Sequence, residues 1–128
     1  MQDYGTIKSV IELIETNETA LRQKVVTQEH YELSEPYVCL RVLSSQTDRP
    51  HQSRRAKVTI SVEVLSKYSG ILEIVQVMNR LQQILNQMTF VNVHGEAQLE
   101  FTEAKIVDEN DGRRRGVQLY TVRVNLHP

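Results

Sequence analysis

Several features that small proteins often depend on are scarce in this sequence. Its 128 residues include one cysteine, Cys39, which excludes an internal disulfide framework and a four-cysteine zinc site. The five glycines are scattered, so the chain has no glycine-rich phosphate-binding loop. No apolar run approaches the roughly 18 residues of a membrane-spanning helix, so we expect no membrane partner. The N-terminus lacks a basic stretch followed by an apolar one, so we expect no secretory signal.

The charge of the chain is nearly balanced. Fifteen basic and 16 acidic side chains give a formal net charge of −1, which excludes a basic protein that coats nucleic acid by overall charge. Hydrophobic residues make up 40% and charged residues 24%, as in ordinary globular proteins. Length and composition therefore predict one soluble intracellular domain over residues 1–128.

Two segments have the period of an amphipathic helix. The first extends from about Thr6 to Glu15 and the second from Ile71 to about Met88. Their apolar positions include Ile7, Val10, Ile11 and Ile14 in the first segment and Ile74, Met78, Leu81 and Leu85 in the second. Asp3 or Thr6 is a candidate N-cap for the first helix and Ser69 for the second, because these side chains accept hydrogen bonds from free backbone N–H groups.

Four segments alternate apolar and polar residues, as half-buried strands do. They are Tyr37–Leu43, Lys57–Val64, a stretch from Ala97 to Ile106, and Val117–Leu126. The apolar parity changes within the third segment, which either a β-bulge near Thr102 and Glu103 or a sheet buried on both faces there would explain. Asp111-Gly112 predicts a hairpin turn between the last two strands. The order of the elements predicts an α+β fold: an antiparallel sheet of about four strands with two helices packed on one face.

The second predicted strand has the clearest pattern. Its apolar residues are Val58, Ile60, Val62 and Val64. A slip of one residue in strand pairing would expose all four, so they must share one face of the sheet. We expect the helix at 71–88 to pack on that face.

A long polar segment separates the first two predicted strands. Residues 44–56 read SSQTDRPHQSRRA, which is longer than a plain hairpin needs. Long loops of this kind are usually functional or disordered. We expect this loop to project from the domain and to meet acidic groups of a neighbouring subunit or another protein.

Basic residues gather at two places in the sequence. They are Arg49, Arg54, Arg55 and Lys57 in or beside the polar loop, and Arg113, Arg114 and Arg115 after the predicted turn. Surface solvation explains such clusters about as well as contact with an acidic partner does. Only one aromatic residue, Tyr120, lies near the second cluster, which gives little support to base stacking. These six arginines are therefore candidates for a protein interface, with a weak DNA contact as the alternative.

Residue types that carry out catalysis or bind metals do not form recognisable patterns here. The histidines are His30, His51, His94 and His127, and none stands at a ligand spacing from another or near Cys39. Cys39 lies within a predicted strand, where a small structural residue is the simpler interpretation than a nucleophile. Glu96, Glu100 and Glu103 fit the polar side of a strand. The sequence predicts no enzyme, no catalytic or metal-binding residue and no cofactor.

Several stretches carry a resemblance to a known family. Pro36–Leu40 precedes the polar loop, and Ala56–Val64 follows it. Ser69-Gly70 leads into the second helix, and Asp111-Gly112 leads into Arg115–Val124. On these stretches the chain, over roughly residues 7–126, resembles the tail completion family of tailed bacteriophages, prophages and gene transfer agents.

The resemblance implies a structural protein of the virion, a tail terminator or tail-to-head joining protein. Such proteins have an α+β fold and assemble into a hexameric ring on the head-proximal end of the tail tube, where they stop polymerisation and join tail to head. The implied partners are copies of itself, the tail tube protein and head connector proteins, with a weak DNA contact in the ring lumen. The implied location is the virion tail, and the bacterial host cytoplasm during assembly. The alternatives are another neck or head–tail adaptor ring subunit, and an unrelated small α+β protein-binding module.

Overall fold

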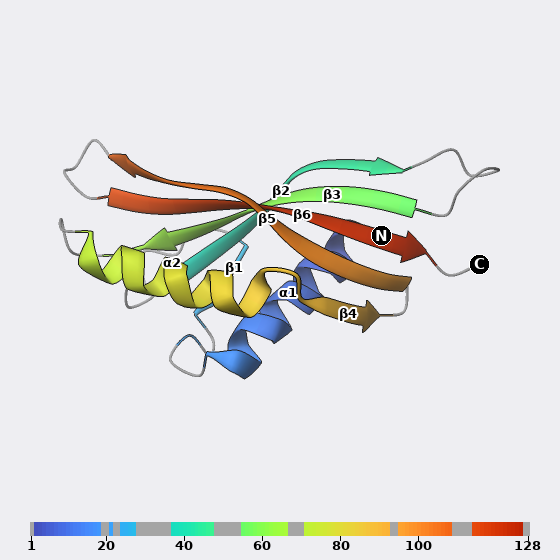
Figure 1. Cartoon of the computed structure of the whole chain (residues 1–128), viewed down its shortest axis with the longest axis horizontal. Coiled ribbons are helices and arrows are strands. Elements are labelled where there is room, and N and C mark those ends of the chain that lie inside the picture. Colours follow the sequence, from blue (N-terminus) through green and yellow to red (C-terminus); the bar gives the residue numbers. More distant parts are fainter. Residues whose placement is uncertain are drawn as a thin grey trace.

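The computed structural model describes residues 2–18, 21, 24–27, 37–47, 55–66, 71–92, 95–108 and 114–126. In chain order the elements are α1 (Gln2–Asn17), β1 (Val25–Val26), β2 (Tyr37–Thr47), β3 (Arg55–Leu65), α2 (Leu72–Leu85), β4 (Thr89–Asn92), β5 (Gly95–Asp108) and β6 (Arg114–Leu126). Figure 1 shows both helices on one side of a curled sheet, so the molecule has two layers. The predicted α+β class is confirmed.

The sheet contains six strands in the order β1-β2-β3-β6-β5-β4. The prediction of a wholly antiparallel sheet of about four strands is wrong, because β1 and β4 add to it and β1 runs parallel to β2. β1 has two residues and β4 has four, and segments this short show no alternating pattern in a sequence. The four strands that alternation predicts are the central ones, and they pair antiparallel as β2-β3-β6-β5.

The hydrophobic core lies between the helices and the middle of the sheet. Its fully buried members include Val58, Ile60, Val62 and Val64 of β3, Ile74, Leu81 and Leu85 of α2, and Val10 and Ile14 of α1. The predicted face of β3 is therefore the one that the helices cover. Burial of each large apolar side chain contributes about 1.5–3 kcal/mol, so this contact is the main force that joins the two layers.

The helices begin at other residues than the predicted N-caps. α1 begins at Gln2, so Asp3 and Thr6 lie within the helix. The N-cap position of α2 is Ile71, which makes no side-chain capping hydrogen bond, while Ser69 lies outside the described residues. The acidic residue in the first turn, Glu73, compensates because a carboxylate is favoured at a helix N-terminus. None of the described helices has the length and apolar character needed to cross a membrane.

The predicted loop at 44–56 is partly strand. β2 continues to Thr47 and β3 begins at Arg55, and the two strands remain paired as far as Thr47 opposite Ala56. Backbone hydrogen bonds hold this ladder, so β2 continues through Ser44, Ser45 and Gln46 although their side chains are polar and exposed. The segment at 48–54 lies outside the described residues. In Figure 1 this end of the sheet, on the right, extends beyond the helices.

Of the two explanations for the change of parity in β5, the bulge is confirmed. The register of β5 against β6 shifts between Phe101 and Glu103. Before the shift, Leu99 is buried beneath the helices; after it, Ala104 stands opposite the buried Gln118 and lies on the helix side. Odd-numbered residues of β5 thus face the helices before the bulge and even-numbered residues after it, in agreement with the sequence pattern.

Candidate functional site

The basic residues singled out in the sequence lie at opposite ends of the sheet. Arg55 stands opposite Asn125 near one end of β6, and Arg115 stands opposite Leu65 near the other. Positions 115 and 125 are ten residues apart on one strand, a span of about 33 Å. The two clusters therefore cannot form one site within a single chain. Arg49, Arg54 and Arg113 lie outside the described residues.

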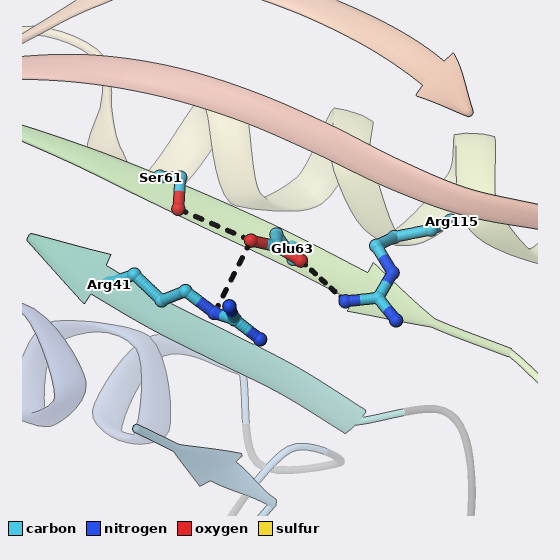
Figure 2. Close-up of polar contacts among 4 residues, drawn as sticks. All are labelled: Arg41, Ser61, Glu63 and Arg115. Carbon is cyan, nitrogen blue, oxygen red and sulfur yellow. Dashed lines mark hydrogen bonds and ion pairs between the residues drawn. The ribbon is translucent and has the colours of Figure 1, made fainter. Parts of the chain in front are cut away.

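Arg115 belongs to a polar cluster on the face of the sheet that points away from the helices (Figure 2). Glu63 is at its centre, and Glu63 Oε1 accepts a hydrogen bond from Arg115 Nη1 at 2.6 Å. Glu63 Oε2 lies 3.5 Å from Arg41 Nε and accepts a long hydrogen bond from Ser61 Oγ at 3.4 Å. These four residues are called the Glu63 cluster below.

The strand register brings the Glu63 cluster together. Cys39 and Val117 stand directly opposite Glu63 on its two neighbouring strands, so Arg41 and Arg115 are its diagonal neighbours. The side chains of Glu63 and Arg115 are only 13% and 18% exposed. Their attraction is therefore less screened by water than that of a surface pair.

The Glu63 cluster could not be predicted from the sequence. Its residues come from three strands, and Arg115 and Glu63 are 52 positions apart. Glu63 is the only carboxylate on the face of β3 that points away from the helices. Its closeness to Arg115 follows only from the pairing of β3 with β6, which places Glu63 opposite Val117, two residues from Arg115.

Arg114 has a different environment from Arg115. It points to the helix side of the sheet, and its Nε lies 3.1 Å from Oδ1 of Asp108, its direct partner in the ladder. The two side chains are 43% and 83% exposed, so the pair contributes about 0.2–1 kcal/mol at most. Arg114 is therefore accessible to a partner, whereas Arg115 is engaged by Glu63.

A second polar surface lies at the other end of the sheet, around Arg55. There a hollow of about 690 Å³ is lined in part by Arg55 and Lys57 of β3, Arg123 of β6 and Glu96 of β5. All four residues are exposed, and Arg123 Nε lies 3.5 Å from Glu100 Oε2 at the side of the hollow. Three basic side chains against one carboxylate in the lining give this basic hollow a positive character that suits an acidic group.

One polar pair lies inside the core, between α2 and β6. Gln118 Nε2 donates to the carbonyl oxygen of Met78 at 2.9 Å, and Gln118 Oε1 accepts from the Tyr120 hydroxyl at 3.0 Å. Burial raises the pKa of Tyr120 well above its ordinary value, so the hydroxyl stays protonated. The pair is internally satisfied and anchors α2 on the sheet, so it is not a candidate site.

The described residues assemble no metal centre. No group of three or more His, Cys, Asp or Glu residues that could bind a metal occurs among them. All four histidines, His30, His51, His94 and His127, lie outside the described part of the chain. Cys39 is a fully buried thiol, and Glu96, Glu100 and Glu103 are exposed on β5.

Comparison with known proteins gives two findings. The family model of tail completion protein gp17 matches residues 13–125. Among solved structures, the chain is similar to a protein of the virion of a native gene transfer agent particle, with a TM-score of 0.66 and 19% sequence identity over 90% of this chain and 83% of that one. At this identity the second finding shows a common fold alone. No curated protein matches the chain by sequence.

Proposed function

The chain belongs to the tail completion protein gp17 family, structural proteins of phage tails, and on that premise we propose that it ends the polymerisation of a tail tube. In this proposal residues 1–128 form one tail-terminator-like domain. Six copies form a ring at the head-proximal end of the tube, and the ring joins tail to head. The partners are copies of the chain, the tail tube protein and the head connector proteins.

The observation that carries the proposal is the family match. It extends from the second half of α1 to the end of β6 and thus includes the whole core of the sheet. The similar solved chain, which is part of a gene transfer agent virion, supports a location in a particle of this kind. The protein would be in the host cytoplasm during assembly and in the virion tail afterwards.

The geometry of the described residues is compatible with a ring subunit. Such a subunit needs complementary side surfaces and two different axial surfaces, and its function is non-enzymatic and requires no cofactor. The basic hollow, around Arg55, Lys57 and Arg123, is one candidate for an axial or side surface that meets acidic groups. Arg114, which stays accessible at the opposite end, is a candidate for another.

The direct test is an in-frame deletion of the gene in its phage or prophage. We expect tails of uncontrolled length and heads without attached tails in electron micrographs of the lysate. Wild-type protein supplied from a plasmid should restore uniform tails, and a core variant such as Ile60→Asp, which should not fold, should not. Tails of normal length on attached heads in the deletion strain would contradict the proposal.

Fractionation of incomplete particles separates the proposal from the neck-adaptor alternative. A tail terminator should copurify with tails made in a strain that lacks heads. A neck or adaptor protein should copurify with DNA-filled heads made in a strain that lacks tails. An unrelated binding module would remain a monomer in light scattering at high concentration and would associate with neither particle.

A DNA contact in the ring lumen would have a distinct signature. Contacts that let DNA slide depend on phosphates, so they weaken steeply as salt increases. We propose that the arginines contact protein instead, so the purified protein should not bind DNA at physiological salt. The informative variant is Arg113→Ala with Arg114→Ala, which leaves Arg115 and its ion pair to Glu63 intact. Salt-dependent binding by the wild type that this variant loses would establish the lumen contact.

A further inference from the structure

Two stretches of strand edge have no partner strand among the described residues. On β2, the short β1 pairs only with Val38 and Cys39, which leaves the edge at 42–47 without a described neighbour. On β5, β4 pairs with residues 95–98, and the linker before β4 bonds to Leu99 and Phe101. The β5 edge at 102–108 has no described neighbour beyond that point.

Strand alternation identifies the backbone groups that each edge presents. The N–H group of Val38 donates to the carbonyl oxygen of Lys24, on the side of β2 where β1 lies. The backbone N–H and C=O groups of even-numbered β2 residues therefore point toward this edge as far as Val42. The register shift between Val42 and Ser44, which the sequence did not predict, changes the parity, so that Ser45 faces the edge. Leu99 exchanges backbone hydrogen bonds with the linker before β4, so odd-numbered residues of β5 face the edge as far as Phe101. The bulge after Phe101 changes the parity, so the backbone groups of Ala104 and Ile106 face the edge.

The two edges cannot meet within one chain. They are on opposite borders of the sheet, since β2 and β5 are separated by β3 and β6. They are also at different levels: residues 42–47 are level with 120–124 of β6, and residues 102–108 are level with 114–119. The only β5 edge that can approach the β2 edge is therefore that of a second copy of the chain.

The uncharged β2 edge and the exposed apolar residues on both edges favour this occupant. Natural sheets protect exposed edges with charged side chains, especially lysine, but 42–47 reads VLSSQT and has no charge. Leu43 on this edge is 55% exposed, and Ile106 and Val107 on the other are each 37% exposed. Antiparallel pairing over the full length of both stretches places Leu43 of one copy close to Val107 of the next.

A hollow beside the β5 edge provides a place for side chains of an added strand. It has a volume of about 220 Å³, lies between α2 and β5, and is lined by Val75, Met78, Ala104 and Ile106 among others. When a strand is added to a sheet edge, backbone hydrogen bonds supply affinity and adjacent pockets receive alternate side chains. Ser45 of the added strand lies on the helix side of its own sheet, so it would be one of the residues over the hollow.

We propose that copies of this chain join head to tail by strand pairing, with β2 at 42–47 of one copy antiparallel to β5 at 102–108 of the next. The inference rests on the proposed ring and assigns its subunit interface. With Ser44 opposite Val107, each copy is shifted by six residues along the strands, about 20 Å, because Ser44 is level with Thr121 of β6 and Val107 with Arg115. The strands are therefore inclined to the ring axis, as in a closed barrel. An interface between unlike edges pairs both of these stretches in every copy when the ring closes.

Disulfide trapping in assembled tails tests the proposal. Ser44→Cys and Val107→Cys place thiols on the outward face of the two edges, at positions that do not exchange backbone hydrogen bonds across the new ladder. Cα atoms of such pairs are about 4.5 Å apart, within the range of a disulfide. A second combination, Ser44→Cys with Lys105→Cys, covers the register two residues away. The native Cys39 is fully buried and serves as the unreactive background.

The variants are supplied to the deletion strain, and the purified tails are oxidised and separated without reductant. Two chains that each carry one introduced cysteine, at 44 in one and at 107 or 105 in the other, should together give a dimer band, while neither alone should. The double variant should give a ladder of higher multimers that reduction removes. Thr59→Cys, in the middle of the sheet, is the control and should give no band with Val107→Cys. Dimers of a single variant alone, or no band in either register, would overturn the edge pairing. Tail length in the same preparations tests the proposed function separately.

Discussion

The two faces of β3 place the same backbone in contrasting surroundings. On the helix side, Val58, Ile60, Val62 and Val64 are fully buried. On the opposite side, Lys57 is exposed, Thr59 is half-buried and Glu63 is held in a network of charges. Beneath α2, Gln118 and Tyr120 form a neutral, internally bonded pair, whereas the Glu63 cluster on the other side satisfies its charges by ion pairs across strands.

The face that points away from the helices is not uniform, because its side chains differ in burial from one end to the other. At the end near the Glu63 cluster, Tyr37, Cys39 and Ser61 are buried although they point away from the helices. At the other end, Lys57 and Arg123 are exposed beside the basic hollow. The expectation of a sheet covered on one face is therefore incomplete, because part of the opposite face is also withdrawn from water.

The largest contrast between the faces should appear when a charge is placed on each. Ile60→Asp buries an uncompensated carboxylate, which should cost several kcal/mol, comparable to the whole stability of a small domain. Thr59→Asp adds the same group one residue earlier on the other face and should cost about 1 kcal/mol or less. Urea denaturation followed by circular dichroism measures both. Equal losses would mean that the faces have been assigned incorrectly.

The next contrast concerns the close packing of the helix side. Gly116 faces α2, and a Cβ added there would clash with Met78 Sδ and lie 2.6 Å from Ile74 Cγ2. Gly116→Ala should therefore cost about 1–3 kcal/mol. In the double variant with Met78→Ala the clash with sulfur is absent, so the combined loss should be smaller than the sum of the single losses. Simple additivity in the double-mutant cycle would contradict a direct contact.

Ion pairs across the strands should differ in importance according to their burial. Glu63→Gln removes the ion pair of the half-buried Arg115 and should cost about 2 kcal/mol. The matched change Asp108→Asn affects the exposed pair with Arg114 and should cost about 0.5 kcal/mol or less. Free energies of unfolding from urea titrations at constant salt provide the comparison. If the two losses were the same, the partial burial of the Glu63 cluster would have no energetic consequence.

The last comparison concerns the buried tyrosine, whose expected effect is small and depends on pH. Tyr120→Phe removes one hydrogen bond and should cost about 1 kcal/mol at neutral pH. Because burial raises the pKa of Tyr120 in the folded protein, the unfolded chain releases its proton first, above pH 10 or so. Stability of the wild type should then fall as pH rises through this range, and that contribution is absent in Tyr120→Phe.

The stability difference between the two proteins should thus narrow from pH 8 toward pH 11. The other tyrosines are common to both proteins and cancel in the difference. A difference that stayed constant over this range would show that Tyr120 ionises as readily in the folded protein as in the unfolded one.

The parts of the fold that the sequence predicts are those with long periodic patterns. β3 and α2 repeat their apolar positions over enough residues to identify both the element and its buried face. The bulge in β5 was also predictable, because the apolar parity changes on either side of Thr102. β1 and β4 were not, since two and four residues carry no period and their pairing depends on the tertiary structure.

The candidate sites were less predictable than the fold. Because Arg113, Arg114 and Arg115 are adjacent in the sequence, they were predicted to act as one cluster. In a strand, however, neighbouring side chains point to opposite faces. Arg114 consequently meets Asp108 while Arg115 meets Glu63, a residue 52 positions away. The basic hollow likewise combines Arg55 with Arg123, which only the β3–β6 register brings to the same end of the sheet.

The bulge in β5 also limits how the part of the β5–β6 hairpin beyond Phe101 can change in length during evolution. Beyond Phe101, each residue faces the helix side or the open side according to its distance from the bulge. Loss or gain of one residue there would turn Glu103 and Lys105 toward the helix side, and Ala104 and Ile106 away from it. Homologues should therefore differ in this part of the hairpin by pairs of residues on each strand, and a homologue with a single-residue change should carry a compensating second bulge.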